Sequence, residues 1–263
     1  MNPFNIQNGV STDSALSAEE LLRKHHVDPS VREQLLAYAR EEQREQGVAH
    51  QDSEPQMPPE DTPPNMHREI MIVPGFLPPD ICKEYVEYIE KQQEIDLSVF
   101  DADATNKSGK IEWEVDKQTR DTQTVDIEPI KEVVVELMRL AVREYINPYF
   151  NVQIKDSELP QILVYHPGGH YRPHIDAETL FNDGSGVLSW RRNVDRDISL
   201  VVYLNGDFEG GEIVFPKQAI TVKPREGLLI AFPSNHHFLH GVNPVTKGVR
   251  YAIVDWFSLG RDR

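Results

Sequence analysis

The feature that most constrains the fold of this chain is a series of short apolar runs that fills its second half. Turns rich in Gly, Pro, Asn and Asp separate the runs, and no helix-prone stretch lies between them. Runs of about four to eight apolar and β-branched residues bounded by such turns are typical of strands. We predict strands at QILVYH, HYRPHID, ISLVVYLN, GEIVFP, AITVKP, GLLIAFP, HHFLHGV and RYAIVDWFS.

Two helices are predicted before these strands, over residues 77–93 and about 127–147. In the first, Ile81, Tyr85 and Ile89 share one face. The second has a wide apolar face built from Ile130, Val133, Val134, Leu137, Leu140 and Ala141. Helices that precede a run of strands indicate an antiparallel sandwich or barrel with helices packed against it. The expected fold class is therefore mainly β with flanking helices, around a double-stranded β-helix (jelly-roll) core.

Residues 1–66 differ in composition from residues 67–263 and are predicted to form a separate region. They contain helix-prone stretches, followed by an acidic segment with prolines at positions 55, 58, 59, 63 and 64, which exclude helix there. We expect a helical N-terminal extension and a linker. The apolar stripe of the extension is narrow and needs a partner surface, and self-association is one candidate. A partly disordered tail is the alternative. Residues 67–263 are expected to form the main domain.

Charge and hydropathy limit the classes of partner that the chain is expected to bind. The formal net charge is −16 at pH 7, so nucleic acid and anionic membranes would repel the protein, and we expect neither as a partner. No apolar run approaches the roughly 20 residues of a membrane helix, and no signal-peptide pattern is evident. The single cysteine, Cys82, cannot form an internal disulfide and is expected on a buried helix face. A cytoplasmic location follows as an expectation.

A candidate metal site stands in the run HYRPHID. His174 and Asp176 are two residues apart, and in a strand such residues point to the same face, so both can reach one ion. His240, in HHFLHGV, can supply a third ligand. Two histidines and one carboxylate with open positions form the facial triad of non-haem Fe(II) oxygenases. A His-x-Asp tripeptide alone is a weak signal, because such residues often occur together without binding a metal.

Three ordered stretches strengthen this interpretation: QILVYHPGGHYRPHID, SLVVYLNGDFEGGEIVFP and GLLIAFPSNHHFLHGVNPVTKGVRYAIVDWF. They resemble the Tyr-x-x-Gly-x-x-Tyr-x-x-His-x-Asp run, the Tyr-Leu-Asn…Gly-Gly-Glu hairpin and the distal His-x-Val-x-Pro-Val…Arg segment of the Fe(II)/2-oxoglutarate-dependent dioxygenase superfamily, in its prolyl 4-hydroxylase-like branch. The resemblance covers about residues 67–263.

The resemblance implies a role for each matching residue. His174, Asp176 and His240 would bind Fe(II), and Arg250 would pair with the far carboxylate of 2-oxoglutarate. Tyr203 and Tyr165 match tyrosines that lie along this co-substrate, although either could simply fill the core. The cofactor would be Fe(II), with 2-oxoglutarate and O2 as co-substrates and ascorbate as a candidate reductant. An arginine suits a carboxylate because its planar fork of donors matches two oxygens and remains charged.

Several other residues are candidates for the walls of the site or for substrate contacts. Tyr171 and Trp256 are candidate walls; Trp256 follows Arg250 by six residues and so shares its face, and core packing is the alternative for it. Residues 177–197 are long for a barrel connection and could form a lid or substrate loop. Trp190 and Arg191 in this loop would then contact substrate, with a solvated loop as the plainer alternative.

The remaining histidines and two glycines are expected to have supporting roles. We expect surface or supporting positions for His166, His170, His236 and His237, with His236 on the face of His240 if the run HHFLHGV is a strand. Gly210 and Gly211 match the hairpin glycines of the family, where a role in the turn is expected.

The function implied by the resemblance is hydroxylation of an unactivated C–H bond, with a prolyl residue in a peptide or protein as the first candidate. A free amino acid or other small molecule is the alternative, because likeness at the iron site does not identify the substrate. A non-catalytic jelly-roll protein, which binds or scaffolds, is the alternative outside the enzymes.

Overall fold

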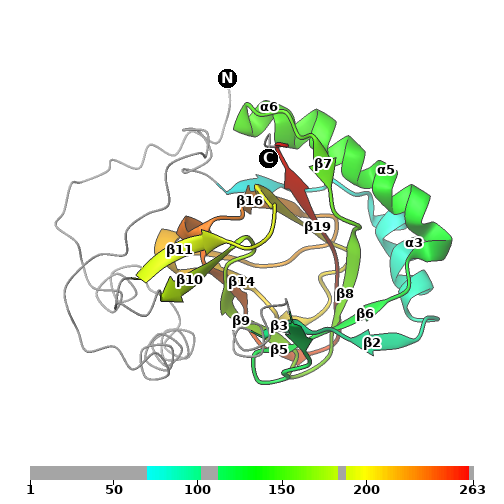
Figure 1. Cartoon of the computed structure of the whole chain (residues 1–263). Helices are drawn as coiled ribbons and strands as arrows, with labels where there is room; N and C mark the ends of the chain where they lie inside the picture. The colour runs from blue at the N-terminus through cyan, green and yellow to red at the C-terminus, as the bar shows by residue number, and fades with distance from the viewer. Residues whose placement is uncertain (1–69, 102–111, 183–187, 261–263) are drawn as a thin grey trace.

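The structure, a computed structural model, describes residues 70–101, 112–182 and 188–260 (Figure 1). The predicted N-terminal helices, the Pro-rich linker and the boundary near residue 66 lie outside these residues. No helix in the described part of the chain is long and apolar enough to span a bilayer.

Two antiparallel sheets face each other and form the core predicted from the short apolar runs. The larger has eight strands in the order β1 (Met71–Val73), β16 (Leu229–Pro233), β12 (Ile198–Tyr203), β19 (Arg250–Ser258), β8 (Gln161–Tyr165), β6 (Gln123–Val125) and β2 (Glu94–Asp96), with β7 (Asp156–Ser157) also on β19. The smaller has five, in the order β15 (Ile220–Val222), β14 (Ile213–Phe215), β17 (His240–Val242), β9 (His170–His174) and β5 (Arg120–Asp121). The mainly β, jelly-roll fold class is therefore confirmed.

Three two-stranded hairpins extend from these sheets: β3 (Val99–Asp101) with β4 (Glu112–Glu114), β10 (Glu178–Asn182) with β11 (Leu188–Arg192), and β13 (Glu209–Gly210) with β18 (Val245–Lys247). The β10–β11 hairpin occupies most of residues 177–197, for which the sequence predicts a long lid or substrate loop. Its strands pair in register from Glu178↔Arg192 to Asn182↔Leu188. The connection is therefore a paired ribbon that projects from the core (Figure 1).

Helices cover the outer face of the larger sheet (Figure 1). The first is α3 (Pro79–Ile89), which buries Cys82, Tyr85 and Ile89, so the prediction for Cys82 is confirmed. The second is α5 (Lys131–Ala141), preceded by a 3-10 turn at Glu128–Ile130 and continued by a π-helical turn at Val142–Ile146 and by α6 (Asn147–Phe150).

The predicted buried face of the second helix is only partly right. Helix α5 buries Val134, Met138 and Ala141, whereas Val133 is 63% exposed and Leu140 is 39% exposed. A helix that lies on a sheet buries one narrow stripe, so a wide apolar face must leave part of itself in solvent.

The core has two apolar compartments, one on each face of the larger sheet. The outer compartment lies between this sheet and the helices, and the inner compartment lies between the two sheets. Strand β19 contributes to both: Tyr251, Ile253 and Phe257 belong to the outer compartment, and Ala252 and Val254 to the inner one. This alternation follows from the two-residue period of a strand.

Two predicted strands are shorter than expected. In HHFLHGV, residues His236–Phe238 form a 3-10 turn, and strand β17 begins only at His240. The side chain of Asn235 caps this turn by accepting a hydrogen bond from the backbone N–H of His237. The face predicted for His236 from strand alternation is therefore wrong. In HYRPHID, strand β9 ends at His174.

Candidate metal centre

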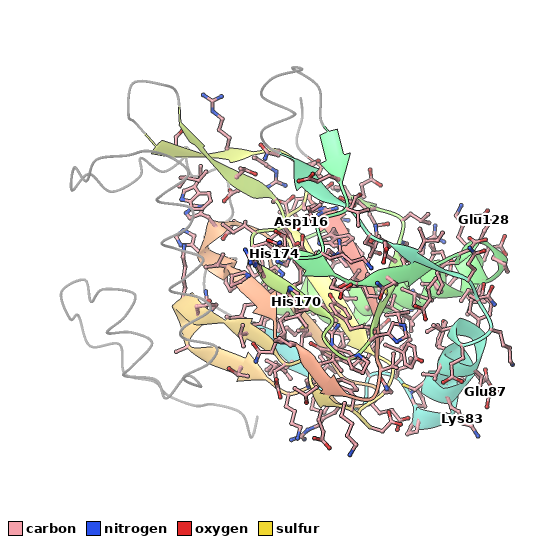
Figure 2. The ribbon with its side chains drawn as sticks, turned by 90° about the horizontal axis from the view of Figure 1, so that it is seen from below. Lys83, Glu87, Asp116, Glu128, His170 and His174 are labelled. Atoms are coloured by element: carbon pink, nitrogen blue, oxygen red, sulfur yellow. The ribbon has the colours of Figure 1, made fainter. Side chains whose placement is uncertain are left out.

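Two adjacent strands of the smaller sheet place two histidines opposite each other. His174 ends β9 and His240 begins β17, and the two residues are directly paired across these antiparallel strands. Directly opposed residues of a sheet hold their side chains on the same face. In the view of Figure 2, His174 lies near the centre of the molecule, whereas Lys83 and Glu87 of α3 lie at its edge.

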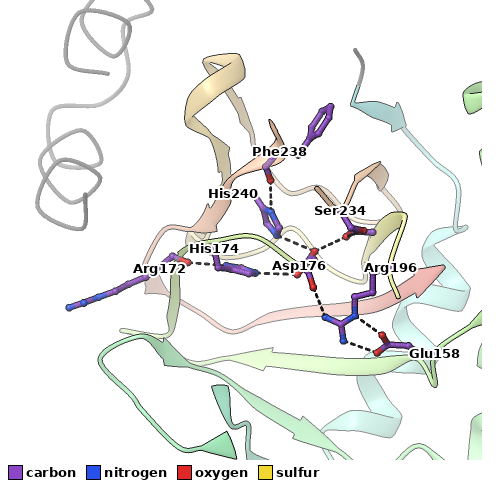
Figure 3. Close-up of polar contacts among 9 residues, drawn as sticks. Glu158, Arg172, His174, Asp176, Arg196, Ser234, Phe238 and His240 are labelled. Atoms are coloured by element: carbon purple, nitrogen blue, oxygen red, sulfur yellow. Dashed lines mark hydrogen bonds and ion pairs between the residues drawn. The ribbon is translucent and has the colours of Figure 1, made fainter. Parts of the chain in front are cut away.

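Asp176 brings a carboxylate to the two imidazoles. It follows the end of β9, and its two oxygens lie 3.5 Å from His174 Nε2 and 3.5 Å from His240 Nε2. One ligand atom of each of the three residues lies within 4.8 Å of the others (Figure 3). His240 is 5% exposed, and the side chain of Asp176 is 7% exposed. The three residues predicted from sequence therefore converge at one largely buried point and could hold a metal ion.

Backbone carbonyls set the orientation of both imidazoles. His174 Nδ1 lies 2.9 Å from the carbonyl oxygen of Arg172, and His240 Nδ1 lies 3.0 Å from that of Phe238 (Figure 3). Because a carbonyl only accepts, each Nδ1 must carry the proton and donate it. This leaves each Nε2 without a proton on the side where Asp176 lies, so that its lone pair is available to a metal ion, as in metal-binding histidines.

A second set of contacts holds Asp176. The hydroxyl of Ser199 donates to Asp176 Oδ2 at 2.6 Å, and Ser199 in turn lies 2.8 Å from the hydroxyl of Ser234. Arg196 donates to the backbone carbonyl of Asp176 at 3.2 Å and pairs with Glu158 at 2.5 and 2.7 Å. Together these contacts fix both the carboxylate and the backbone of the acidic residue (Figure 3).

Burial and charge act in opposite directions on the ionisation of these side chains. Burial alone would raise the pKa of Asp176, but the imidazoles of His240 and His174 hold that pKa well below its usual range. Burial lowers the pKa of His240 to about 4, against the opposing effect of Asp176. At neutral pH the site therefore offers a carboxylate and a neutral His240, which are the forms that bind a metal.

Arg250 supplies a buried positive charge to the inner compartment. It begins β19 and lies directly opposite Tyr165 of β8. The residue is 1% exposed, and its Nε and Nη1 have no hydrogen-bond partner among the described residues. An unpaired guanidinium in such a place is costly, so these donors are suited to an anion that binds there.

Two tyrosines flank this guanidinium. Its central carbon lies 4.5 Å from the ring centre of Tyr165 and 5.0 Å from that of Tyr203. The hydroxyl of Tyr203 is buried and has no partner among the described residues. Burial raises the pKa of Tyr203, so its phenol keeps a proton to donate. Both tyrosines therefore lie beside the guanidinium, and their contact with a co-substrate stays a prediction.

The same compartment contains the rings that surround His240. Phe215 and Phe232 lie 5.7 and 4.6 Å from the imidazole of His240, between ring centres, and both belong to the inner cluster with Tyr165 and Tyr203. The triad and the guanidinium therefore share one apolar compartment between the sheets.

Gly210 and Gly211 have the structural role expected of them. Their φ angles are 77° and 67°, a left-handed conformation that L side chains rarely adopt. A Cβ on Gly210 would meet the carbonyl oxygen of Pro244 at 2.2 Å, and one on Gly211 would lie 3.0 Å from Arg250 Cδ. Gly211 therefore leaves space for the stem of Arg250.

Tyr171 and Trp256 contact the site from two sides. The ring of Tyr171 stacks on His174 with 3.5 Å between ring centres, and burial raises the pKa of this tyrosine to about 12. The ring of Trp256 lies under the guanidinium of Arg196, 4.0 Å from its central carbon. Tyr171 is thus a wall beside a candidate ligand, whereas Trp256 supports the arginine that holds Asp176.

Trp190 and Arg191 lie on the β10–β11 hairpin. Trp190 stacks on His236 with 5.2 Å between ring centres, and Arg191 is exposed. His236 also forms an ion pair with Glu178, at 2.6 Å between Nδ1 and Oε2. Because Glu178 is two residues after Asp176, this pair fixes the base of the hairpin beside the candidate metal centre. His236 therefore supports the hairpin and is outside the cluster of candidate ligands.

The other histidines are also outside that cluster. His166 is exposed and pairs with Glu94 at 2.7 Å. His170 lies near two backbone carbonyls, those of Gly168 at 3.0 Å and Gln118 at 3.1 Å. Within the described residues, the only group of three or more potential ligands is the one formed by His174, Asp176 and His240.

Sequence reasoning missed the residues that hold the candidate ligands in place. One signal for Ser199 was present, because it is the single serine in the largely apolar run ISLVVYLN. No comparable signal pointed to Glu158 or Arg196, since the distance between them is 38 residues along the chain.

Comparison with known proteins shows that part of this chain is similar to a known family. The sequence profile described as the 2OG-Fe(II) oxygenase superfamily matches residues 160–258, which contain all three candidate ligands and Arg250. Over these residues the chain is similar to the 2OG-Fe(II) oxygenase superfamily. Enzymes of this superfamily are dioxygenases that need Fe(II), 2-oxoglutarate and O2, and the donor set of this chain fits that metal.

The similar proteins are prolyl hydroxylases. Prolyl 3-hydroxylase 2 of Gallus gallus is 42% identical over 69 residues, and prolyl 3-hydroxylase 1 of the same species is 46% identical over 69 residues. Each alignment covers 24% of this chain and 10% of the relative, so the chain spans only a tenth of the length of these relatives.

Solved structures share the fold. A viral collagen prolyl hydroxylase of Paramecium Bursaria Chlorella virus-1, in complex with 2OG, has a TM-score of 0.53 at 22% identity and covers 72% of this chain and 96% of its own. A prolyl hydroxylase of Trichoplax adhaerens, in complex with a hypoxia inducible factor peptide fragment, has a TM-score of 0.54 at 17% identity and covers 72% and 83%. At these identities the likeness concerns the fold.

Proposed function

We propose that this oxygenase hydroxylates a prolyl residue of a peptide or protein, with Fe(II) held by His174, Asp176 and His240 and with 2-oxoglutarate held by Arg250. The observation that carries this proposal is that one compartment contains both a cluster of potential metal ligands and a buried guanidinium with unpartnered donors. Three ligand atoms converge within 4.8 Å, and a buried guanidinium has donors without partners. A metal ion would bind to the three ligand atoms, and a dicarboxylate would pair with the guanidinium.

The chemistry of the donor set fits iron. Two neutral imidazole nitrogens and one carboxylate leave open positions for other ligands, whereas a structural zinc site would have four protein ligands. When bound, the iron and 2-oxoglutarate supply the oxidation of the co-substrate by O2 that leads to hydroxylation of a C–H bond.

The residues of this chain perform the remaining tasks. Arg250 and the hydroxyl of Tyr203 would bind the far carboxylate of 2-oxoglutarate by charge-assisted and neutral hydrogen bonds. Ser199 and Arg196 hold Asp176, as described above. The apolar rings of Phe215 and Phe232 exclude water from the side of His240. The protein therefore contributes orientation and a dry compartment.

The prolyl substrate is proposed from the relatives. The aligned curated proteins are prolyl 3-hydroxylases, and one fold neighbour was solved with a peptide fragment. The partly buried Trp190 and the exposed Arg191, on the hairpin beside the candidate metal centre, would contact such a peptide. Ascorbate as reductant, a cytoplasmic location and self-association through the N-terminal arm stay predictions.

A coupled assay tests this proposal. The protein is incubated with Fe(II), 2-oxoglutarate and O2, and succinate is measured with proline-containing peptides, with free proline and without substrate. We expect peptide-stimulated succinate and a peptide mass increased by one oxygen atom, both absent in His174→Ala. Stimulation by free amino acids alone would favour the small-molecule alternative. Absence of iron binding and of succinate would favour a non-catalytic protein.

A further inference from the structure

A second pocket lies on the opposite face of the larger sheet from the candidate metal centre. It has a volume of about 290 Å³ and lies where α5 and the following π-helical turn pack over β19 and β7. Its apolar lining includes Val135, Met138, Val142 and Phe257. A pocket of this size is at the small end of those that hold organic ligands.

Asp255 is the unusual member of the lining. It is 0% exposed and lies on β19 between Ile253 and Phe257, which belong to the outer compartment, so strand alternation places its side chain on the helix side. Its Oδ1 accepts a hydrogen bond from the backbone N–H of Trp256 at 2.8 Å. Its Oδ2 has no partner among the described residues. Buried carboxyl groups are normally paired, so this oxygen needs an explanation.

The charged residues at the rim of the pocket do not supply that partner. Arg139 forms an ion pair with Glu136, and Lys155 forms a hydrogen bond with Gln153. Both rim residues are exposed. The one acceptor of the lining that is buried and unsatisfied is therefore Asp255, and a ligand with a donor would complement it.

Burial shifts the pKa of the Asp255 carboxyl. It raises the pKa of Asp255 to about 8; Glu158 adds to the increase, and the Trp256 N–H and Arg196 oppose it. A cation placed against the carboxyl would instead favour its charged form. An ammonium group would thus convert an isolated acid into an ion pair in apolar surroundings.

We propose that this pocket binds a small aliphatic amine in its ammonium form, with the nitrogen donating to Asp255 Oδ2 and the carbon chain packed against Met138, Val142 and Phe257. The site is separate from the oxygenase site, because the side chains of Asp255 and Arg250 extend from opposite faces of β19. Amine and 2-oxoglutarate should therefore bind together.

The test uses the full chain and n-butylammonium chloride, with affinity measured by ligand-observed NMR titration. We expect saturable binding that Asp255→Asn weakens roughly ten- to hundredfold, because a charge-assisted hydrogen bond is lost. The matched control is Asp156→Asn, which removes an exposed acid from the rim and should bind as the wild type does. Val142→Phe fills the pocket and should abolish binding with Asp255 in place.

The proposal would be overturned by the absence of saturable binding to the folded wild type, by unchanged affinity in Asp255→Asn, or by competition between the amine and 2-oxoglutarate. n-Butanol has the same chain without the charge, and equal affinity for it would likewise show that Asp255 does not select an ammonium ion.

Discussion

Replacement of Arg250 by alanine tests the co-substrate pocket most directly. The wild-type guanidinium is 1% exposed, and Nε and Nη1 have no partner among the described residues, so a bound carboxylate would gain both donors without loss of an internal ion pair. Removal of one partner from a buried, hydrogen-bonded charge pair costs about 3–5 kcal/mol. The dissociation constant of 2-oxoglutarate should therefore increase by roughly two to four orders of magnitude.

Calorimetric titration of the metal-loaded protein without O2 measures this change, with metal content determined separately. Metal content should remain near that of the wild type, because Arg250 is outside the triad. Arg250→Lys is the matched control: it keeps the charge without the planar fork and should bind with intermediate affinity. His174→Ala should instead lose the metal. Unchanged 2-oxoglutarate affinity in Arg250→Ala would refute the assignment of the pocket.

Two further variants address residues that support the candidate metal centre and Arg250, and a third addresses Asp255 in the separate pocket. Ser199→Ala leaves Asp176 Oδ2 without its 2.6 Å donor and should weaken metal binding about 10- to 100-fold, measured by competition with a chelator. Gly211→Ala places a Cβ 3.0 Å from Arg250 Cδ at a φ of 67°, so it should destabilise the fold by about 1–2 kcal/mol in thermal unfolding and weaken 2-oxoglutarate. Asp255→Asn should be more stable than the wild type at pH 7. Because the pKa of Asp255 is raised, the folded state keeps a proton that the unfolded state loses. The free energy of unfolding of the wild type, relative to that of the variant, should therefore fall as pH rises from about 4 to 8, by at most about 1.4 kcal/mol per pH unit. The free energies of unfolding are measured by denaturant titration at several pH values. If they changed with pH equally in the wild type and the variant across that range, this prediction would be contradicted.

The sheet core and the positions of the ligands were predictable because they depend on short-range periodicity. His174 and Asp176 are two residues apart, a spacing that predicts a shared face in a strand, although Asp176 lies just beyond the end of β9. Arg250 and Trp256 are six apart on β19, so the two-residue period of a strand predicts their shared face. Only the meeting of β9 with β17, which pairs His174 with His240, needed the tertiary fold.

The parts that sequence reasoning missed depend on longer-range or competing effects. Strands such as β2, β5 and β6 have two or three residues and include charged or polar side chains, so they show little apolar alternation. At His236, the cap by Asn235 favours a helical turn over the strand that the apolar pattern suggests. The Arg196–Glu158 pair joins distant segments. No local sequence pattern indicates that contact.

Strand β19 shows why one register must be maintained across both faces of the larger sheet. Even-numbered residues from Arg250 to Val254 face the inner compartment, and odd-numbered residues from Tyr251 to Phe257 face the helices. A slip of one residue would move the guanidinium of Arg250 under the helices and the carboxyl of Asp255 between the sheets. Neither side chain would then reach its proposed ligand, and both would remain buried. Pairing with β12 on one side and β8 on the other excludes such a slip, because both partners would have to shift together.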